Sequence, residues 1–285
     1  MEMTVLNYKE VFEMKIKLGD MTWPEIVEVL KEPNAVILPI GSTEQHGTHL
    51  PVNLDYVHVT YVAEQAAKKV TDEHKIRVLV LPTLPYGETS GTPPFGKVHT
   101  GCIGLSVDTT SRVIEEIVRN LVSHGFKNII VLNGHHENTI PSAAALRKVA
   151  IDFPNLGLYG INWFRLAFET WPNIRKGGDA AEGHGGEKET AIALAIEPEN
   201  VHLDQAVKGS RSLALPPKYV SQPPPGAVYY HSATRGMRDS GIMSDPTMAS
   251  RETGEKLISA AVDDLVEIIV DIVRSEGTAV KEIPE

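Results

Sequence analysis

Hydrophobic residues along the chain gather in short apolar runs, separated by longer stretches in which they recur with helical spacing. Four runs have the length and composition of buried strands: residues 35–40, 76–81, 127–132 and 156–161. Helical stretches are expected at about 55–69, at 109–124, from about 141 onward and at about 246–275. This alternation predicts an α/β fold in which helices cover both faces of a parallel sheet.

Capping residues mark several of the predicted helix ends. Thr22 and Glu25 bracket Trp23-Pro24 as a capping box for a short first helix. Asp108 is placed to cap the helix that follows it, and Gly125 to close that helix. The order of the strands in the sheet does not follow from these patterns.

We expect a single α/β domain over residues 1–285, because a chain of this length with 42% hydrophobic residues can fold around one core. Helical periodicity fades between Glu199 and Asp245, where Pro216-Pro217 and Pro223-Pro224-Pro225 argue against a long helix. A long Pro-rich loop is therefore expected at about 199–245. Loops of this length usually serve a binding site or an interface.

Charge and cysteine content restrict the partners and the kind of site. The net charge is -10 and the basic residues are scattered, so no basic face is expected for nucleic acid or an anionic membrane. The single cysteine, Cys102, excludes an internal disulfide and any Cys-rich metal site, which leaves His and carboxylate ligands. Met1–Lys17 has no signal-peptide core and no apolar run reaches the length of a membrane span, so we expect a cytoplasmic protein.

A carboxylate and an imidazole follow the first predicted strand. Glu44 and His46 lie where the chain leaves that strand, at the sheet edge where open α/β sheets collect their ligand sites. Residues two apart in an extended segment face the same side, so these two side chains can converge on one point. Asp55 stands at a predicted loop-to-helix boundary, where it can serve as a helix N-cap or as a further ligand.

The third predicted strand ends in a second pair with the same spacing. His135 and Glu137 come just after Asn133-Gly134. A single His or Glu in a loop is usually solvated surface, but two such pairs at strand ends, with an Asp between them, favour a metal site. Nitrogen and oxygen ligands of this kind suit Zn²⁺ or Mn²⁺.

Longer segments around these residues resemble the creatininase family of hydrolases. Leu38-Pro-Ile-Gly-Ser-Thr-Glu-Gln-His-Gly-Thr-His-Leu-Pro51, followed by Asp55, is similar to its first signature, and Asn133-Gly-His-His-Glu-Asn138 to its second. His184-Gly-Gly-Glu-Lys-Glu-Thr190 and Ser240-Gly-Ile-Met-Ser-Asp-Pro-Thr247 are further family-like segments. The resemblance extends from about residue 20 to about residue 270.

The resemblance implies a three-layer αβα sandwich with a mostly parallel central sheet, and two divalent ions per chain, zinc, manganese or both. Asp55 would bridge the two ions, Glu44 and His135 would complete one site, and His46 and Glu137 would complete the other. A metal-bridging hydroxide would then attack a cyclic amide or related C–N bond of a small polar substrate. The resemblance also implies a homo-oligomer, commonly a hexamer.

Two more residues would lie beside the metals in a protein of this family. His184 and Glu189 are the candidate catalytic residues, and His184 is the favoured proton shuttle to the leaving nitrogen. The alternative is an ordinary helix start, with His184 packed and Glu189 exposed.

The chain departs from the family pattern in two places. It has Val98-His-Thr-Gly-Cys-Ile103 where the family often has Phe-Pro-Gly-Thr. Lys176-Gly-Gly-Asp-Ala-Ala-Glu182 lacks the Trp-Asp pair that encloses the small ring in creatinine-hydrolysing members. Trp163 and Trp171 could replace that wall, or could be buried in the core. We therefore expect an enzyme that is not dedicated to creatinine.

Other functions remain open at this stage. The family resemblance also permits hydrolysis of a cyclic keto-sugar such as a keto-inositol, or removal of a formyl group from a formylamino-pyrimidine. A protein without activity could use the same residues to hold a structural metal or a small molecule. A nucleotide-binding module is disfavoured because no Gly-rich phosphate-binding loop follows the first strand.

Overall fold

Among the residues that the structure describes, four parallel strands form the central sheet, in the order β2-β1-β3-β4. The structure is a computed structural model and describes residues 15–89, 100–178, 183–209 and 241–275. The strands are β1 (Asn34–Ile40), β2 (Arg77–Val80), β3 (Asn128–Asn133) and β4 (Gly157–Asn162). Each begins or ends within one or two residues of the apolar run that predicts it.

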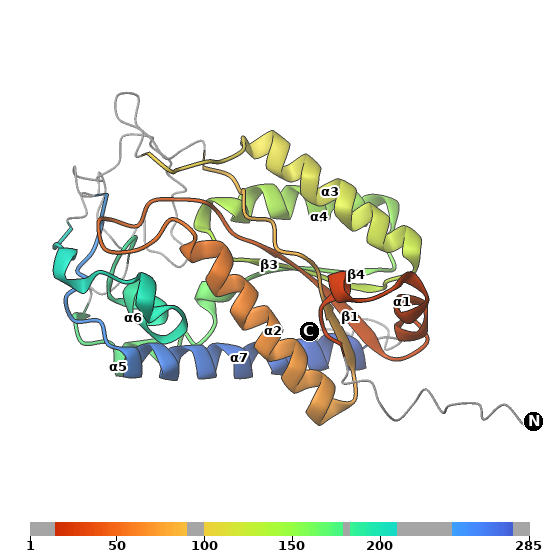
Figure 1. Cartoon of the computed structure of the whole chain (residues 1–285). Coiled ribbons are helices and arrows are strands. Elements are labelled where there is room, and N and C mark those ends of the chain that lie inside the picture. Colours follow the sequence, from red (N-terminus) through yellow and green to blue (C-terminus); the bar gives the residue numbers. More distant parts are fainter. Residues whose placement is uncertain (1–14, 90–99, 179–182, 210–240, 276–285) are drawn as a thin grey trace, which may run out of the picture.

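Helices cover both faces of this sheet (Figure 1). The helices on one face are α2 (Leu54–His74), α6 (Glu187–Ile196) and α7 (Arg251–Arg274). The other face carries α1 (Trp23–Val29), α3 (Val107–His124) and α4 (Thr139–Asp152). A short helix, α5 (Trp171–Ile174), packs against the face with α2 and α7. The predicted three-layer α/β arrangement is therefore confirmed.

Alternation along β1 explains why the sheet needs helices on both faces. Ile37 packs into the core beneath α2 and α7, while Leu38 packs into the core beneath α3 and α4. Successive side chains of a strand point to opposite faces, so an apolar run of this kind has to be covered on both sides.

Helix ends agree with the capping pattern in part. Thr22 and Glu25 form the predicted capping box, and Gly125 closes α3 with a φ of +101°. The prediction that Asp108 caps α3 is wrong: Ser106 is the cap, and its Oγ accepts the Thr109 N–H at 3.3 Å. Asp108 lies in the first turn, where a carboxylate favours the positive end of the helix dipole.

Two helix lengths also differ from expectation. Helix α2 continues five residues beyond Lys69 because Val70 and Thr71 still pack into the core. Helix α7 begins at Arg251, five residues after Pro246, since the Ser250 side chain caps it by accepting the Thr253 N–H. Polar side chains that bond to nearby backbone groups compete with helix formation in this way.

Much of the predicted loop at 199–245 lies outside the described residues, since residues 210–240 are not among them. The described part before that gap contains two short 3-10 turns, Pro198–Asn200 and Leu203–Gln205. The single domain over 1–285 stays a prediction. Among the described residues, every helix is too short or too polar to traverse a lipid bilayer.

Close backbone contacts bring the ends of β1 and β3 against the start of α2. The amide of Gly134 donates to the Ile40 carbonyl at 2.7 Å, which pairs the two strand ends. A Cβ at Gly134 would lie 2.6 Å from the carbonyl oxygen of Asp55, so only glycine permits this approach. The first turn of α2 therefore reaches the carboxyl edge of the sheet.

Candidate metal centre

Glu44, His46 and Asp55 meet at this edge although the chain turns back between them. Glu44 and His46 follow β1, and the Glu44 amide donates to the Val52 carbonyl at 3.0 Å, which holds the return segment in place. Asp55 lies in the first turn of α2, one residue after the helix begins, while Asn53 occupies the cap position. Asp55 is therefore not the N-cap. All three of these acidic and imidazole side chains are at most 4% exposed.

The two carboxylate oxygens of Asp55 face two different imidazoles. Oδ1 lies 3.4 Å from Nε2 of His46, and Oδ2 lies 2.9 Å from Nδ1 of His135. Glu44 approaches the same His135 atom, with Oε2 at 3.2 Å. Asp55 thus stands between the residues that follow β1 and those that follow β3.

Glu137 is placed differently from the other predicted ligands. Its Oε2 lies 3.0 Å from Nε2 of His135, on the opposite edge of the ring from Glu44 and Asp55. Its side chain is 27% exposed, whereas those of Glu44 and Asp55 are nearly inaccessible. The structure therefore brings Glu137 to His135 but not beside His46.

His184 and Glu189 approach from α6 and the turn before it. The ring of His184 stacks on that of His46 with centroids 4.2 Å apart, and its Nδ1 lies 4.0 Å from Glu44 Oε2. Glu189 Oε2 accepts the Gly185 N–H at 2.6 Å and lies 3.8 Å from His46 Nε2. Both residues thus border the cluster, with side chains 13% and 31% exposed.

Burial and neighbouring charges shift the pKa values of this cluster in opposite directions. Burial raises the pKa of Glu44 to about 7, against the attraction of His135. Burial opposes protonation of His46, but the charges of Asp55 and Glu189 outweigh it and raise its pKa to about 10. Burial and the nearby His46 lower the pKa of His184 to about 4. Carboxylates and imidazoles in such close contact titrate as a coupled set, because the protonation of one group changes the pKa values of its neighbours.

In the part of the chain that the structure describes, two groups of side chains have ligand atoms within 4.8 Å of one another: Glu44, Asp55 and His135, and Glu44, His46 and His184. Although each lies within ion-pair distance of a neighbouring side chain, the buried atoms Glu44 Oε2, Asp55 Oδ2 and His135 Nε2 make no well-aligned hydrogen bond within the described residues. Buried polar atoms without partners are costly, and a cation close to them would remove that cost. The donor set therefore fits divalent metal ions.

The remaining predicted site features fall in several places. Trp163 and Trp171 are 4% and 2% exposed and belong to the core beneath α2 and α7. Cys102 lies beside the centre, where its Sγ accepts the Gln45 N–H at 3.2 Å. Residues 98–99 and 179–182 lie outside the described residues.

Sequence reasoning did not single out two buried residues: Gln45, which contacts His184, and Glu187, in the first turn of α6. Glu187 is fully buried and accepts the backbone N–H groups of Lys176 and Gly177, at 2.7 and 2.6 Å. The sequence signal that could have pointed to Glu187 is its position just after the Gly185-Gly186 pair, in the first turn of a helix. Its long-range partners could not be read from the sequence.

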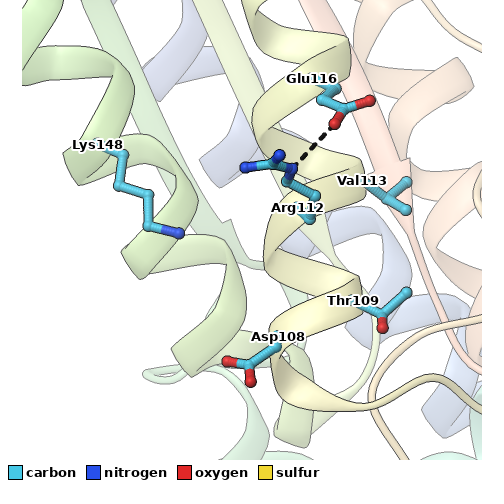
Figure 2. Close-up of a pocket in the computed structure, with 6 residues that line it drawn as sticks. All are labelled: Asp108, Thr109, Arg112, Val113, Glu116 and Lys148. Atoms are coloured by element: carbon cyan, nitrogen blue, oxygen red, sulfur yellow. Dashed lines mark ion pairs between the residues drawn. The ribbon is translucent and has the colours of Figure 1, made fainter.

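A separate surface hollow of about 450 Å³ lies between α3 and α4 (Figure 2). It is lined by Asp108, Thr109, Arg112, Val113, Glu116 and Lys148. Arg112 pairs with Glu116 at 3.0 Å, so these opposite charges largely neutralise each other. None of the candidate metal ligands lines this hollow.

Comparison with known proteins agrees with the geometry. The sequence profile of the creatininase family, described as creatinine amidohydrolase, matches residues 19–269. The chain belongs to the creatininase family. Its relatives in this family are hydrolases, and the resemblance expected from the four signature segments is confirmed.

Individual relatives differ in what they hydrolyse. The creatinine amidohydrolase of Pseudomonas putida is 30% identical over 88% of this chain and 95% of its own length. A 3-dehydro-scyllo-inosose hydrolase of Thermotoga maritima is 27% identical over 88% of this chain and 82% of its own. A mycofactocin precursor peptide peptidase of Mycobacterium tuberculosis is 25% identical over 81% and 83%.

Solved creatininase structures share the fold. One crystal structure of creatininase superposes with a TM-score of 0.73 at 26% identity, covering 89% of this chain and 96% of its own. Two others, at 25% identity and TM-scores of 0.73, are a manganese creatininase and a mutant of Zn-Zn type; each covers 90% of this chain and 98% of its own.

Proposed function

We propose that this chain is a binuclear metal-dependent hydrolase whose centre is built around Asp55. The observation that carries the proposal is that the two oxygens of Asp55 face His46 on one side and His135 on the other. A carboxylate in this position suits a bridge between two cations. Two divalent ions bound here, zinc or manganese, would lower the pKa of a water molecule and polarise the carbonyl group under attack.

The other ligands divide around Asp55. Glu44 and His135 form one group with it, supported by their 3.2 Å contact. His46 belongs to the second group, with Glu137 as the partner that the family resemblance implies. The assignment of Glu137 rests on that resemblance and on its contact with His135, since the side chain joins neither compact group.

His184 would carry a proton to the leaving nitrogen. Its side chain is 13% exposed at the edge of the cluster, and its lowered pKa leaves the ring neutral near pH 7, so it would first take up the proton of the attacking water and then pass it to the leaving nitrogen. Glu189, in the first turn of the following helix α6, supports this role because its carboxylate accepts the Gly185 N–H in the turn that carries His184. General acid–base catalysis by a positioned histidine contributes about 10²–10⁴-fold to a rate.

The proposed substrate is a small polar molecule with a cyclic amide or related C–N bond. A keto-inositol is the main alternative, supported by similarity to a hydrolase of 3-dehydro-scyllo-inosose. A formylamino-pyrimidine is the second alternative. We further expect a cytoplasmic homo-oligomer, with a hexamer as the assembly that the resemblance implies; analytical ultracentrifugation would measure its mass.

Two measurements test this proposal. Zinc- and manganese-loaded protein should contain two ions per chain by elemental analysis, whereas one ion or none favours a structural or small-molecule-binding protein. The loaded protein should then hydrolyse at least one member of a panel of cyclic amides, formamides and keto-inositols. A protein with two ions that turns over none of these compounds would contradict the substrate class but not the metal centre.

A further inference from the structure

Gln45, between Glu44 and His46, has a side chain held at both ends of its amide. Oε1 accepts the Gly47 N–H at 2.9 Å, and Nε2 donates to the Gly241 carbonyl at 3.0 Å. In the flipped amide, Nε2 would face the Gly47 N–H, donor against donor, and Oε1 would face the Gly241 carbonyl, acceptor against acceptor. These contacts therefore fix the orientation of the amide. The residue is 5% exposed.

The backbone carbonyl of Gln45 lies 2.6 Å from Nε2 of His184. A carbonyl oxygen tolerates a ring nitrogen at this distance only if that nitrogen carries a proton and donates it. The side-chain amide nitrogen of Gln45 also lies 3.0 Å from Nε2 of His184. A ring nitrogen cannot donate and accept at once, so we assign the proton to Nε2 from the shorter contact, the one to the carbonyl. Nδ1 of His184 is then the nitrogen with a free lone pair, and it faces Glu44.

His46 is fixed in the same manner by the preceding carbonyl. Its Nδ1 lies 3.0 Å from the Glu44 carbonyl oxygen, which leaves Nε2 facing Asp55. Successive carbonyls of this segment thus orient two stacked histidines whose remaining nitrogens point toward the carboxylates. Backbone carbonyls commonly select the tautomer of imidazoles at metal sites in this way.

The segment after the long loop anchors Gln45. Gly241 has a φ of +69°, and a Cβ there would overlap Oε1 of Gln45. Two residues later, the Met243 amide donates to the His184 carbonyl at 2.9 Å. The fourth family-like segment of the sequence therefore contacts both Gln45 and His184, which gives it a function that its distance in the sequence from the metal ligands does not suggest.

We propose that Gln45 is a positioning residue: its backbone carbonyl, held in place by the contact of its side chain with Gly241, keeps His184 in the tautomer with the proton on Nε2, so that Nδ1 faces the metal centre. Whether Nδ1 takes up a proton or binds an ion, only this tautomer presents a lone pair there. The inference rests on the proposed function, because it assumes that His184 works at that centre.

Nuclear magnetic resonance can test the tautomer directly. Zinc-loaded protein with ¹⁵N-labelled histidine is studied by long-range ¹H–¹⁵N correlation, and His184→Ala identifies the signals of His184. The wild type should show the proton on Nε2. Gly241→Ala should populate the second tautomer, because its Cβ would displace the Gln45 side chain and with it the carbonyl that accepts from Nε2. Gln45→Met loses both side-chain bonds that hold this carbonyl but also loses the amide donor that opposes a proton on Nε2, so it should populate the second tautomer to a smaller extent. Gln45→Met keeps the bulk of the side chain, so it guards against a fold defect in the glycine variant.

Gly125→Ala is the matched control. Gly125 also has a positive φ, at +101°, but a Cβ there would meet only Leu30 Cδ1 at 4.0 Å. This variant carries comparable backbone strain far from Gln45, and its His184 signals should match the wild type. A wild-type proton on Nδ1, or unchanged His184 signals in both test variants, would overturn the inference.

Zinc content, measured on the same samples, separates this inference from the proposed function. Wild-type protein that binds no zinc contradicts the proposed function, and with it the reason for the tautomer. Two zinc ions together with a proton on Nδ1 of His184 contradict only the positioning role of Gln45.

Discussion

The imidazole rings of His46 and His184 stack with their centroids 4.2 Å apart and their planes 30° apart. Protonating both rings at once is unfavourable, because like charges at such a distance repel strongly. The pKa values reflect this repulsion: they are about 10 for His46 and about 4 for His184, since both rings are largely removed from water but the His46 ring lies beside the Asp55 carboxylate. His184 is consequently the neutral member of the pair.

A neutral His184 at the border of the cluster leads to the first prediction. His184→Ala should retain its metal ions yet turn over substrate about 10²–10⁴-fold more slowly, as expected for loss of a general acid–base group that shuttles the proton. Steady-state kinetics on the best compound of the panel, with elemental analysis of the same sample, measures both. His124→Ala, at the exposed end of α3, is the control. Loss of an ion from His184→Ala would instead make His184 a ligand, as its grouping with Glu44 and His46 allows.

Asp55 provides the second prediction. Asp55→Ala should lose both ions, because its two oxygens face both halves of the centre. Asp108→Ala is a closely matched control: Asp108 occupies the same position in the first turn of α3 that Asp55 occupies in α2. That variant should keep two ions and lose only about 0.3–1 kcal/mol of helix-dipole stabilisation. Retention of either ion by Asp55→Ala would rule out a bridging role.

Glu137 allows a sharper distinction. If it is a ligand, Glu137→Ala should keep one ion per chain and lose the other. If it only orients His135 through the 3.0 Å contact to Nε2, the variant should keep both ions with about 10–100-fold weaker affinity. We expect the first result, and competition titration with a chelator of known affinity distinguishes the two.

The sequence predicts which side chains meet at the candidate metal centre better than it predicts the residues around them. Spacing alone makes Glu44, His46 and His135 candidates for one site, since they follow the carboxyl ends of strands that pair in the sheet. In the sequence, Asp55 can be read as a helix cap or as a metal ligand. The structure excludes the cap, because Asn53 occupies that position, and the glycine at Gly134 lets the first turn of α2 approach the ends of the strands. His184 was found only through family resemblance.

Contacts between distant residues explain most of what the sequence missed. Gln45 bonds to Gly241 across 196 positions, and no local pattern predicts that partner. The wrong cap of α3 has a local cause, because Ser106 and Asp108 are both suitable capping residues and the chain uses the earlier one. From the sequence, Trp163 and Trp171 could line the pocket or lie in the core. In the structure both pack against α2 and α7, so they belong to the core.

Glu187 gives a prediction about stability. Glu187→Ala should leave the N–H groups of Lys176 and Gly177 without their acceptor, lowering the free energy of unfolding by about 2 kcal/mol or more. Urea denaturation measures this difference. Glu252→Ala, on the exposed side of α7 and paired with Lys256, should change stability by no more than about 0.5 kcal/mol. Equal losses in both variants would show that the buried contacts of Glu187 contribute little.

The last prediction is that the enzyme is not dedicated to creatinine. A small flat ring gains much of its affinity from enclosure by apolar and aromatic surface, and one aromatic contact adds about 0.5–1.5 kcal/mol beyond burial. The Lys176–Glu182 segment has no aromatic residue, and its described start is tied to Glu187 through two backbone N–H groups. Trp163 and Trp171 could replace that wall only by leaving a core in which they are 4% and 2% exposed.

We therefore expect kcat/KM for creatinine to fall below about 10⁴ M⁻¹s⁻¹, the lower end of ordinary enzymatic values. A larger polyhydroxylated ring or a ribosylated base should be turned over faster, because a site without that aromatic wall can admit hydrogen-bonding groups. The polar segment Tyr229-Tyr230-His231-Ser232 is a candidate source of such groups, although it lies outside the described residues. Steady-state kinetics with metal-loaded protein decides the matter, since efficient turnover of creatinine would mean that another side chain encloses the small ring.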